Sequence, residues 1–355
     1  MMSMEFTILV WVFVSIYLSY VVGRFLISKS QKFTLNKSNQ NGVRFGSQTK
    51  PIYGGVIFYI VFLLSIVFSL LISTDVQTIQ HLFIFLLIGT IGFSVGLADD
   101  LLSPSPFFKF FGQSLIAIIL ILLGVETQIT NNELINAVVT FVWVIGIMNA
   151  INLLDNMDAI SGSISTLIFI AVVALLLLSN TINFPIVILL AGIIGSLLGF
   201  LKFNWNPARM YMGDNGSQFL GAILAVVGIM YFWNNSSVVE INMQKSFWAT
   251  LLAFIIPIID TVTVFINRIA RGQSPFVGGR DHTTHHLFYL GLSIKQVAIL
   301  LDFLTFVSLG LSVYIIKFVD EWTMVHSLIF GGYSILLFVL IFSTTKISKP
   351  KEQTA

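Results

Sequence analysis

The sequence predicts an all-α, polytopic membrane protein, on three observations. Hydrophobic residues make up 56% of the 355-residue chain and charged residues only 10%, a composition outside the range of soluble globular domains. Apolar runs of about 20 residues, long enough to cross a bilayer core about 30 Å thick, recur along the chain. The polar segments between them are too short to bury a core of their own, which predicts one membrane domain over residues 1–355.

About eleven membrane-spanning helices are expected, with ten as the alternative count. Each is predicted by a nearly continuous apolar run with few charged residues. The expected spans are approximately 6–27, 52–74, 81–98, 108–124, 134–152, 158–179, 184–202, 217–233, 246–267, 294–316 and 325–345.

The basic residues predict the orientation of the chain. When successive loops are assigned alternately to two sides, every one of the 18 Lys and Arg residues except Lys245 and Lys317 falls on one side. Cytoplasmic loops carry the excess of Lys and Arg, so this side is expected to be cytoplasmic. With an odd number of spans, the N-terminus then lies outside and the C-terminus in the cytoplasm.

Most acidic residues on that same side occur in clusters at the ends of spans. Ionisable groups are expensive inside a membrane, so a chain retains them where function requires them. The clusters therefore predict an active site at the cytoplasmic face. Their members are Asp99 and Asp100 after the third span, Asp155 and Asp158 after the fifth, Asp214 after the seventh and Asp281 after the ninth.

Adjacent carboxylates at Asp99 and Asp100 end the third span, and Lys109 opens the next. Neighbouring carboxylates repel unless a cation or a proton lies between them. The pair therefore suits a metal ligand beside a general base. The alternative interpretation is a solvated helix end.

The segment from Asn149 to Asp158 concentrates amides and carboxylates between two apolar runs. Asp155 and Asp158 are three residues apart, so on a helix they would share one face, with Asn152 about one turn before them. Such a row could hold a nucleotide or Mg²⁺. An N-cap would need only one of these side chains.

Residues 199–217 place a single acid, Asp214, between Gly213 and Gly216 at the start of an apolar run, with Asn204 upstream. Glycines permit close approach of the backbone, and the amides at a helix start can bind phosphate oxygens. Asp214 is therefore expected to hold a Mg²⁺ ion that bridges phosphates.

The loop 268–286 is rich in arginine and histidine. Arg268, Arg280, His282 and His285 are donors suited to phosphate and sugar oxygens. A zinc site is the competing interpretation, and the absence of cysteine disfavours it. Asp260, inside the preceding span, is expected to pair with Lys202 or an arginine.

These motifs resemble, in order and spacing, those of the polyprenyl-phosphate N-acetylhexosamine-1-phosphate transferases. The resemblance covers about residues 50–292. The matching motifs are Pro51-x-x-Gly54-Gly55, Asp99-Asp100, Lys109-x-x-x-Gln113, Asn149-Ala150-x-Asn152-x-x-Asp155-x-x-Asp158, and Asn204-x-x-Pro207-Ala208-x-x-x-Met212-Gly213-Asp214-x-Gly216-Ser217.

The chain departs from the family pattern in two motifs. The family's Asp-Gly-x-Asp-Gly stretch is present with Asn156 and Ala159 in place of the two glycines. The family's His-x-His-His stretch is present with Thr284 in place of one histidine, and without a full set of histidines the chain resembles the simpler nucleotide-sugar branch more than the pentapeptide-transferring branch.

The resemblance implies that an undecaprenyl phosphate attacks the β-phosphorus of a UDP-HexNAc donor, most naturally UDP-GlcNAc, and releases UMP. It implies a bacterial inner-membrane enzyme with Mg²⁺, or Mn²⁺, held by Asp214 with Asp99 or Asp100. The other implied roles are catalytic for Asp99, Asp100, Lys109, Asp155 and Asp158, and substrate-binding for Asn149, Asn152, Asn204, Arg268, Arg280, His282 and His285.

Several alternatives stay open at this point. They are transfer of phospho-MurNAc-pentapeptide, a route through an aspartyl phosphate, a secondary transporter and a non-catalytic scaffold. A transporter would carry its polar residues near mid-membrane, whereas here they lie at the ends of spans. The expected partners are the donor, the lipid acceptor and the bilayer, with a homodimer left open and no nucleic acid.

Overall fold

The computed structural model describes residues 3–30, 50–102, 104–179, 182–235, 242–274 and 279–348. Every regular element in these residues is a helix, which confirms the predicted all-α class. The basic segment 31–49 lies outside the described residues. The helices are α1 (Met4–Lys29), α2 (Gly54–Ile72), α3 (Val76–Leu102), α4 (Pro106–Leu122), α5 (Glu133–Leu154), α6 (Ile160–Leu177), α7 (Phe184–Asn204), α8 (Asp214–Gly228), the π-helix η1 (Ile229–Trp233), α9 (Met243–Ala253), α10 (Ile255–Ala270), α11 (Thr283–Tyr289), α12 (Ile294–Phe318) and α13 (Met324–Ile347).

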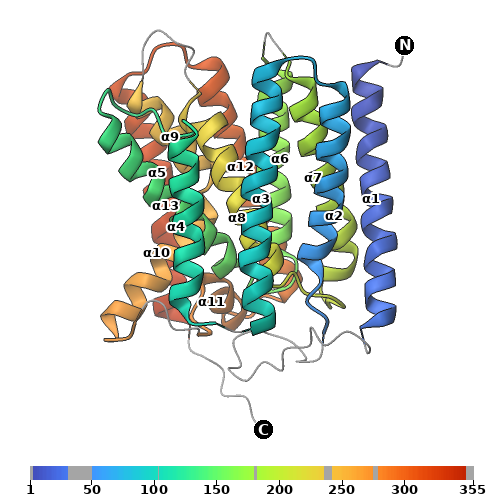
Figure 1. Ribbon diagram of the computed structural model, residues 1–355. Coiled ribbons are helices and arrows are strands. Elements are labelled where there is room, and N and C mark those ends of the chain that lie inside the picture. Colours follow the sequence, from blue (N-terminus) through green and yellow to red (C-terminus); the bar gives the residue numbers. More distant parts are fainter. Residues whose placement is uncertain are drawn as a thin grey trace.

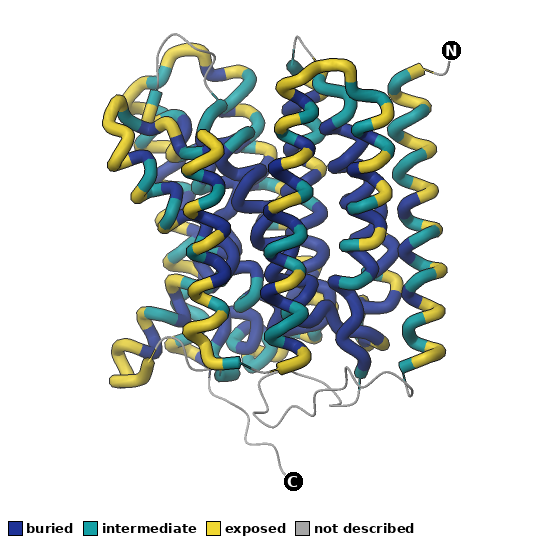
Figure 2. Tube along the Cα trace, viewed as in Figure 1, coloured by how far each residue is buried: buried dark blue, intermediate teal, exposed yellow. Residues whose placement is uncertain are grey.

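Helix α8 forms the centre of the bundle. Every one of its residues after Asp214 is buried, because α2, α3 and α5 pack around it. The outer helices α1, α12 and α13 instead expose large apolar side chains, as expected for surfaces that face lipid. Figure 2 shows this change from a buried interior to an exposed rim. Asp214 is therefore the polar first residue of the most buried helix.

The number of spans agrees with the sequence only in part. In the described residues nine helices are long and apolar enough to cross a membrane, and α9 with α10 gives a tenth if the pair counts as one span. The run predicted at 108–124 forms α4, which has 17 residues and is therefore about 26 Å long. It lies at the short end of what a bilayer requires.

The span predicted at 246–267 is not one continuous helix. Helices α9 and α10 meet at Phe254 with a bend of 80°. Pro257 lacks the N–H group that a continuous helix would donate to the carbonyl of Ala253, so the helix stops and a new one begins. In Figure 1, α10 extends outward at the end of the bundle that also holds α11.

The first helix packs tightly against α7. Small residues Ser15, Ser19 and Gly23 form its buried face, and Ser19 Oγ donates to the carbonyl of Ser196 at 2.7 Å. A Cβ atom at Gly199 would lie 2.6 Å from both Cβ and Oγ of Ser19. The helices can approach this closely only because position 199 has no side chain.

We expect Gly199→Ala to lower the free energy of unfolding by about 1–3 kcal/mol, because the added methyl group overlaps α1. Gly146→Ala is the matched control, because a Cβ at Gly146 has no neighbour within 4 Å. Thermal unfolding in detergent measures both variants. Equal unfolding midpoints for the two variants would contradict the close packing of α1 on α7.

Candidate active site

Two carboxylates and one ammonium group meet where α3, α4 and α8 end or begin. Lys109 Nζ lies 3.1 Å from Asp99 Oδ2 and 3.6 Å from Asp214 Oδ1. All three side chains are partly exposed, at 19%, 15% and 24% respectively. The structure therefore brings together the predicted residues of three separate motifs, and a positive charge already lies between the carboxylates.

Asn152 joins this centre from the last turn of α5. Its Nδ2 donates to Asp214 Oδ1 at 2.6 Å and to Ser217 Oγ at 2.7 Å. The side chain thereby fixes the position of the Asp214 carboxylate at the start of α8.

The neighbouring carboxylate points elsewhere. Asp100 is 6% exposed, and its Oδ2 accepts from the backbone N of Asn215 at 2.8 Å and from Asn215 Nδ2 at 2.5 Å. Asn215 Nδ2 also donates to the carbonyl of Ile52. Asp100 therefore satisfies a backbone donor at the start of α8 and places a negative charge at its positive end.

The residues just before α8 also form hydrogen bonds with the first residues of α2. Backbone N–H groups of Gly54 and Gly55 donate to the carbonyls of Tyr211 and Met212 at 3.2 and 3.1 Å. A Cβ at Gly55 would lie 2.0 Å from Asn215 Oδ1. The glycine is required there because the two backbones approach so closely.

The residues present suit a hard divalent cation. Mg²⁺ prefers oxygen ligands and is usually held by one or two carboxylates together with substrate phosphates. Asp99 and Asp214 supply two partly exposed carboxylates that share a cationic neighbour, Lys109. No group of three acidic or histidine side chains that could hold a metal occurs within the described ranges.

The prediction that Asp155 and Asp158 share one helix face is wrong. Helix α5 ends at Leu154 and α6 begins at Ile160, so both residues lie in the turn between them. Ala159 has a φ of 70°, a left-handed conformation that a helix cannot contain. The turn forms at one of the two positions where the family pattern has glycine.

We expect Ala159→Val to destabilise the protein by about 1–3 kcal/mol, because β-branched residues tolerate positive φ poorly. Ala159→Gly should retain the fold and its activity, since glycine adopts this conformation without strain. Thermal unfolding of the two variants measures the difference. A valine variant as stable as the glycine variant would contradict the left-handed turn.

Asp158 fixes the loop that follows α7. Its Oδ2 accepts from Asn206 Nδ2 at 2.8 Å and from the backbone N of Ala208 at 3.0 Å. Asn204 Oδ1 accepts from the backbone N of Ala159 at 3.0 Å, and its Nδ2 donates to the carbonyl of Met210 at 2.9 Å. Asp158 and Asn204, both predicted site residues, therefore hold the turn between α5 and α6 against the loop that follows α7.

Asn149, which is partly buried, belongs to a row of amides between α4, α5 and α8. Its Nδ2 donates to Gln113 Oε1 at 2.8 Å and to the carbonyl of Ile145. Gln113 Nε2 in turn donates to Gln218 Oε1 at 3.0 Å. The side-chain amide of Asn149, which was predicted to bind substrate, therefore donates to Gln113 of α4 and to a carbonyl of its own helix.

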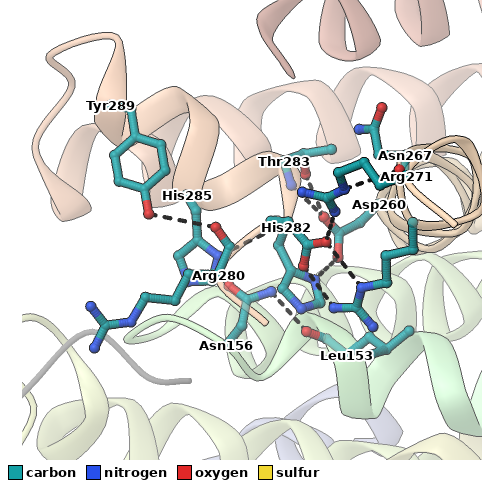
Figure 3. Close-up of polar contacts among 12 residues, drawn as sticks. Leu153, Asn156, Asp260, Asn267, Arg271, Arg280, His282, Thr283, His285 and Tyr289 are labelled. Carbon is teal, nitrogen blue, oxygen red and sulfur yellow. Dashed lines mark hydrogen bonds and ion pairs between the residues drawn. The ribbon is translucent and has the colours of Figure 1, made fainter. Parts of the chain in front are cut away.

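A second polar cluster lies between α10 and α11. Asp260 is 1% exposed, and it faces His282 Nδ1 at 2.9 Å. Its other oxygen accepts from the backbone N and the Oγ1 of Thr283 at 2.8 and 2.6 Å. Figure 3 shows these contacts converging on Asp260. The prediction that Asp260 pairs with Lys202 or an arginine is wrong, because α11 brings its own first residues to this carboxylate.

Arg268 is committed to an ion pair with Asp281. Its side chain is 3% exposed and donates to both oxygens of Asp281, at 3.0 and 2.7 Å. Arg271 also pairs with Asp281. Burial raises the pKa of Asp281, but the hydrogen bonds and charge of the two arginines outweigh it and hold the pKa at about 2.

Arg280 lines a pocket beside this ion pair. The pocket has a volume of about 390 Å³ and is lined by Arg268, Arg271, Gln273, Ser274, Gly279, Arg280 and Asp281. Three guanidinium groups against one carboxylate leave a net positive charge, which suits an anion. The part of the loop at 275–278 lies outside the described residues.

His285 is fully buried, and its environment favours the neutral ring. Burial, with a smaller contribution from the nearby His282, lowers the pKa of His285 to about 3. Burial also lowers the pKa of His286. At neutral pH, His285 is therefore an uncharged hydrogen-bonding group rather than a cation.

His285 is expected to reduce the stability of the folded protein as the pH falls below about 6.5. The unfolded chain binds protons at its histidines near pH 6.5, whereas folded His285 resists protonation down to about pH 3. His286 contributes with the same sign, and Asp281 adds almost nothing above about pH 5. Unfolding midpoints between pH 7.5 and 4.5 test this, and an equally steep decline in His285→Gln would contradict it.

The end of α13 supports both ends of the loop 268–286. Lys346 Nζ donates to Asn267 Oδ1 at 2.9 Å, and Asn267 Nδ2 donates to Thr345 Oγ1 at 3.1 Å. Ser348 Oγ lies 2.6 Å from His286 Nδ1. The last helix therefore helps to position the loop that carries the predicted donor-binding side chains.

Sequence reasoning missed Asn215, Ser217 and Thr283 as site-building residues. Each bonds directly to an acid or amide that was predicted, namely Asp100, Asn152 or Asp260. Ser217 already stands at the end of a matching motif, although no role was assigned to it. For Asn215 and Thr283, the only available signal was their place beside a predicted residue at the start of a helix, where polar side chains often act as caps.

Comparisons with known proteins identify sequences that are similar to this chain. Residues 82–232 match the sequence profile of glycosyl transferase family 4. A Bacillus subtilis (strain 168) protein named probable undecaprenyl-phosphate N-acetylglucosaminyl 1-phosphate transferase is 27% identical, over 64% of each chain. The alignment thus spans just under two thirds of that relative.

Two further relatives are named for a different lipid acceptor or for a different transferred sugar. A Mycobacterium leprae decaprenyl-phosphate N-acetylglucosaminephosphotransferase is 24% identical over 71% of this chain and 69% of its own. A Listeria innocua phospho-N-acetylmuramoyl-pentapeptide-transferase is 29% identical over 68% and 76%. The resemblance inferred from the motifs is confirmed. The region that matches the profile of glycosyl transferase family 4 carries Asp99, Lys109, Asn152 and Asp214.

Proposed function

We propose that this protein transfers a HexNAc-1-phosphate group from a UDP-sugar, most naturally UDP-GlcNAc, to undecaprenyl phosphate and releases UMP. The observation that carries the proposal is the meeting of Asp99, Lys109 and Asp214 at one end of an apolar bundle. A charged centre in this position can receive a water-soluble donor while its acceptor stays in the lipid. The names of the relatives support a polyprenyl-phosphate acceptor.

In the proposed reaction, an oxygen of the lipid phosphate forms a bond to the β-phosphorus of the donor. The bond from that phosphorus to the bridging oxygen breaks, and UMP leaves with the electron pair. Mg²⁺ held by Asp214 and Asp99 would supply positive charge to neutralise the diphosphate oxygens. Lys109 adds a fixed positive charge in the same place, so the protein contributes mainly electrostatic stabilisation and positioning.

The two adjacent acids are assigned different parts. Asp99 faces the centre beside Lys109, where it would hold Mg²⁺ with Asp214 and so orient the lipid phosphate. Asp100 holds the start of α8 through Asn215. Asn152 fixes Asp214, while Arg280, His282 and His285 contribute to the nucleotide-sugar side.

The active site is proposed to face the cytoplasm. Helix α1 begins at one end of the bundle, and α13 ends at the other, beside α11 (Figure 1). The positive-inside rule assigns the end with α11 to the cytoplasm, where UDP-sugars are made. The protein would then be a multi-pass enzyme of a bacterial inner membrane that begins a cell-envelope glycan.

A donor panel tests the proposal. Purified protein is incubated with undecaprenyl phosphate, Mg²⁺ and, separately, UDP-GlcNAc, UDP-GalNAc or UDP-MurNAc-pentapeptide. We expect UMP release with UDP-GlcNAc, and turnover with the pentapeptide donor alone would move the chain to that branch. No UMP release from any donor would overturn the proposal.

A further inference from the structure

A buried hydrogen bond joins the turn after α5 to helix α11. Asn156 is 4% exposed and Thr284 is 0% exposed. Thr284 Oγ1 donates to Asn156 Oδ1 at 2.5 Å, and Asn156 Nδ2 donates to the carbonyl of Leu153 at 2.7 Å. Figure 3 shows Asn156 beside Leu153, below the segment that carries His285.

The two bonded residues stand at positions where the chain departs from the family pattern. Asn156 occupies the place of a glycine in the Asp-Gly-x-Asp-Gly stretch, and Thr284 occupies the place of a histidine in the His-x-His-His stretch. The positions are 128 residues apart in the chain. Their side chains nevertheless contact each other, so a change at either position alters the surroundings of the other.

Physical reasoning explains why either change alone would be unfavourable. Without the hydroxyl of Thr284, the buried Asn156 oxygen would lose its hydrogen bond, and a buried unpaired polar group is costly. A histidine at 284 beside Asn156 would overfill a closed space. A glycine at 156 removes the amide and leaves room for that ring.

We infer that Asn156 and Thr284 act as one pair that positions α11, and so determines how tightly the protein holds its nucleotide-sugar donor. The inference rests on the proposed function, because α11 carries His285 and follows His282, both assigned there to the donor. The bond fixes α11 to the turn that contains Asp155 and Asp158. Both are positioning residues, and neither is assigned contact with the reacting atoms.

The test measures donor KM and kcat for Thr284→Val, Thr284→Ser, Thr284→His, Asn156→Gly and the double variant Asn156→Gly/Thr284→His. Loss of one buried hydrogen bond predicts that Thr284→Val and Asn156→Gly each raise the donor KM about tenfold, with kcat changed less than about threefold. Thr284→Ser retains the hydroxyl and should keep the wild-type KM. The double variant should recover to within about threefold of wild type.

Thr250→Val is the matched control. Thr250 is as buried as Thr284, but its Oγ1 donates to the carbonyl of Ser246 within its own helix. Its donor KM should not change. The inference is overturned if the effects of Asn156→Gly and Thr284→His simply multiply in the double variant, or if Thr284→Val leaves the donor KM at the wild-type value.

A second readout separates this inference from the proposed function. Unfolding midpoints of the same four-member cycle, wild type, Asn156→Gly, Thr284→His and the double variant, require no turnover. Recovery of the midpoint in the double variant supports the pair even if the donor assay fails for the wild-type protein. Additive losses in midpoint overturn the pair even if the wild-type protein turns over UDP-GlcNAc.

Discussion

Asp214→Asn is expected to lower kcat/KM by about 10²–10³-fold, a loss typical of removing one electrostatic group from an active site. The substitution removes the charge that faces Lys109 at 3.6 Å. It also places an amide opposite Asn152 Nδ2, which in the wild-type protein donates to the Asp214 carboxylate at 2.6 Å. UMP release at saturating lipid measures the loss.

Asp320→Asn is the control for this variant. Asp320 is exposed in the connection between α12 and α13 and bears the same substitution without touching the site. Its activity should match the wild type. If Asp214→Asn retained more than a third of wild-type kcat/KM while remaining folded, the central role of Asp214 would be rejected.

Asp260→Asn is expected to lower kcat/KM by about 10²-fold and the free energy of unfolding by about 1–3 kcal/mol. Asp260 accepts three hydrogen bonds at the start of α11, and its contact with His282 Nδ1 favours the tautomer that carries the proton on that nitrogen. An amide in its place presents an N–H group to one of these donors. His282 would then change its tautomer or its position.

The matched control for Asp260 is Thr263→Val on the same helix. Thr263 is fully buried, and its Oγ1 has no hydrogen-bond partner among the described residues. Valine has a similar shape, so the substitution should leave activity unchanged and stability unchanged or slightly higher. Equal losses in the two variants would show that α10 merely tolerates no change, and would reject the specific role of Asp260.

The sequence predicted the helices better than the directions of their polar side chains. Long apolar runs define helices wherever they occur, and only Pro257 divided one of them. Asp99 and Asp100 were both predicted to face the active site, one as a metal ligand and the other as a general base. Successive residues on an α-helix point about 100° apart, so only Asp99 faces Lys109 while Asp100 faces Asn215.

Long-range pairs were the other limit of the sequence. The predicted topology placed the acidic clusters at one membrane face, and Asp214 was therefore expected to lie near Asp99 or Asp100. It could not show that Asp260 would bind His282, because that contact depends on the return of α11 beneath α10. The contact of Asn156 with Thr284 was also hidden, since the motif pattern revealed two departures but not their proximity.

The most direct test of the account follows the β-phosphate of the donor. Purified protein receives UDP-GlcNAc labelled with ³²P at the β-phosphate, together with undecaprenyl phosphate and Mg²⁺. The account predicts that the label moves into the lipid fraction as a polyprenyl diphosphate sugar, with one unlabelled UMP released for each lipid product. Label that stays with the nucleotide, as UDP or as unreacted donor, would contradict it.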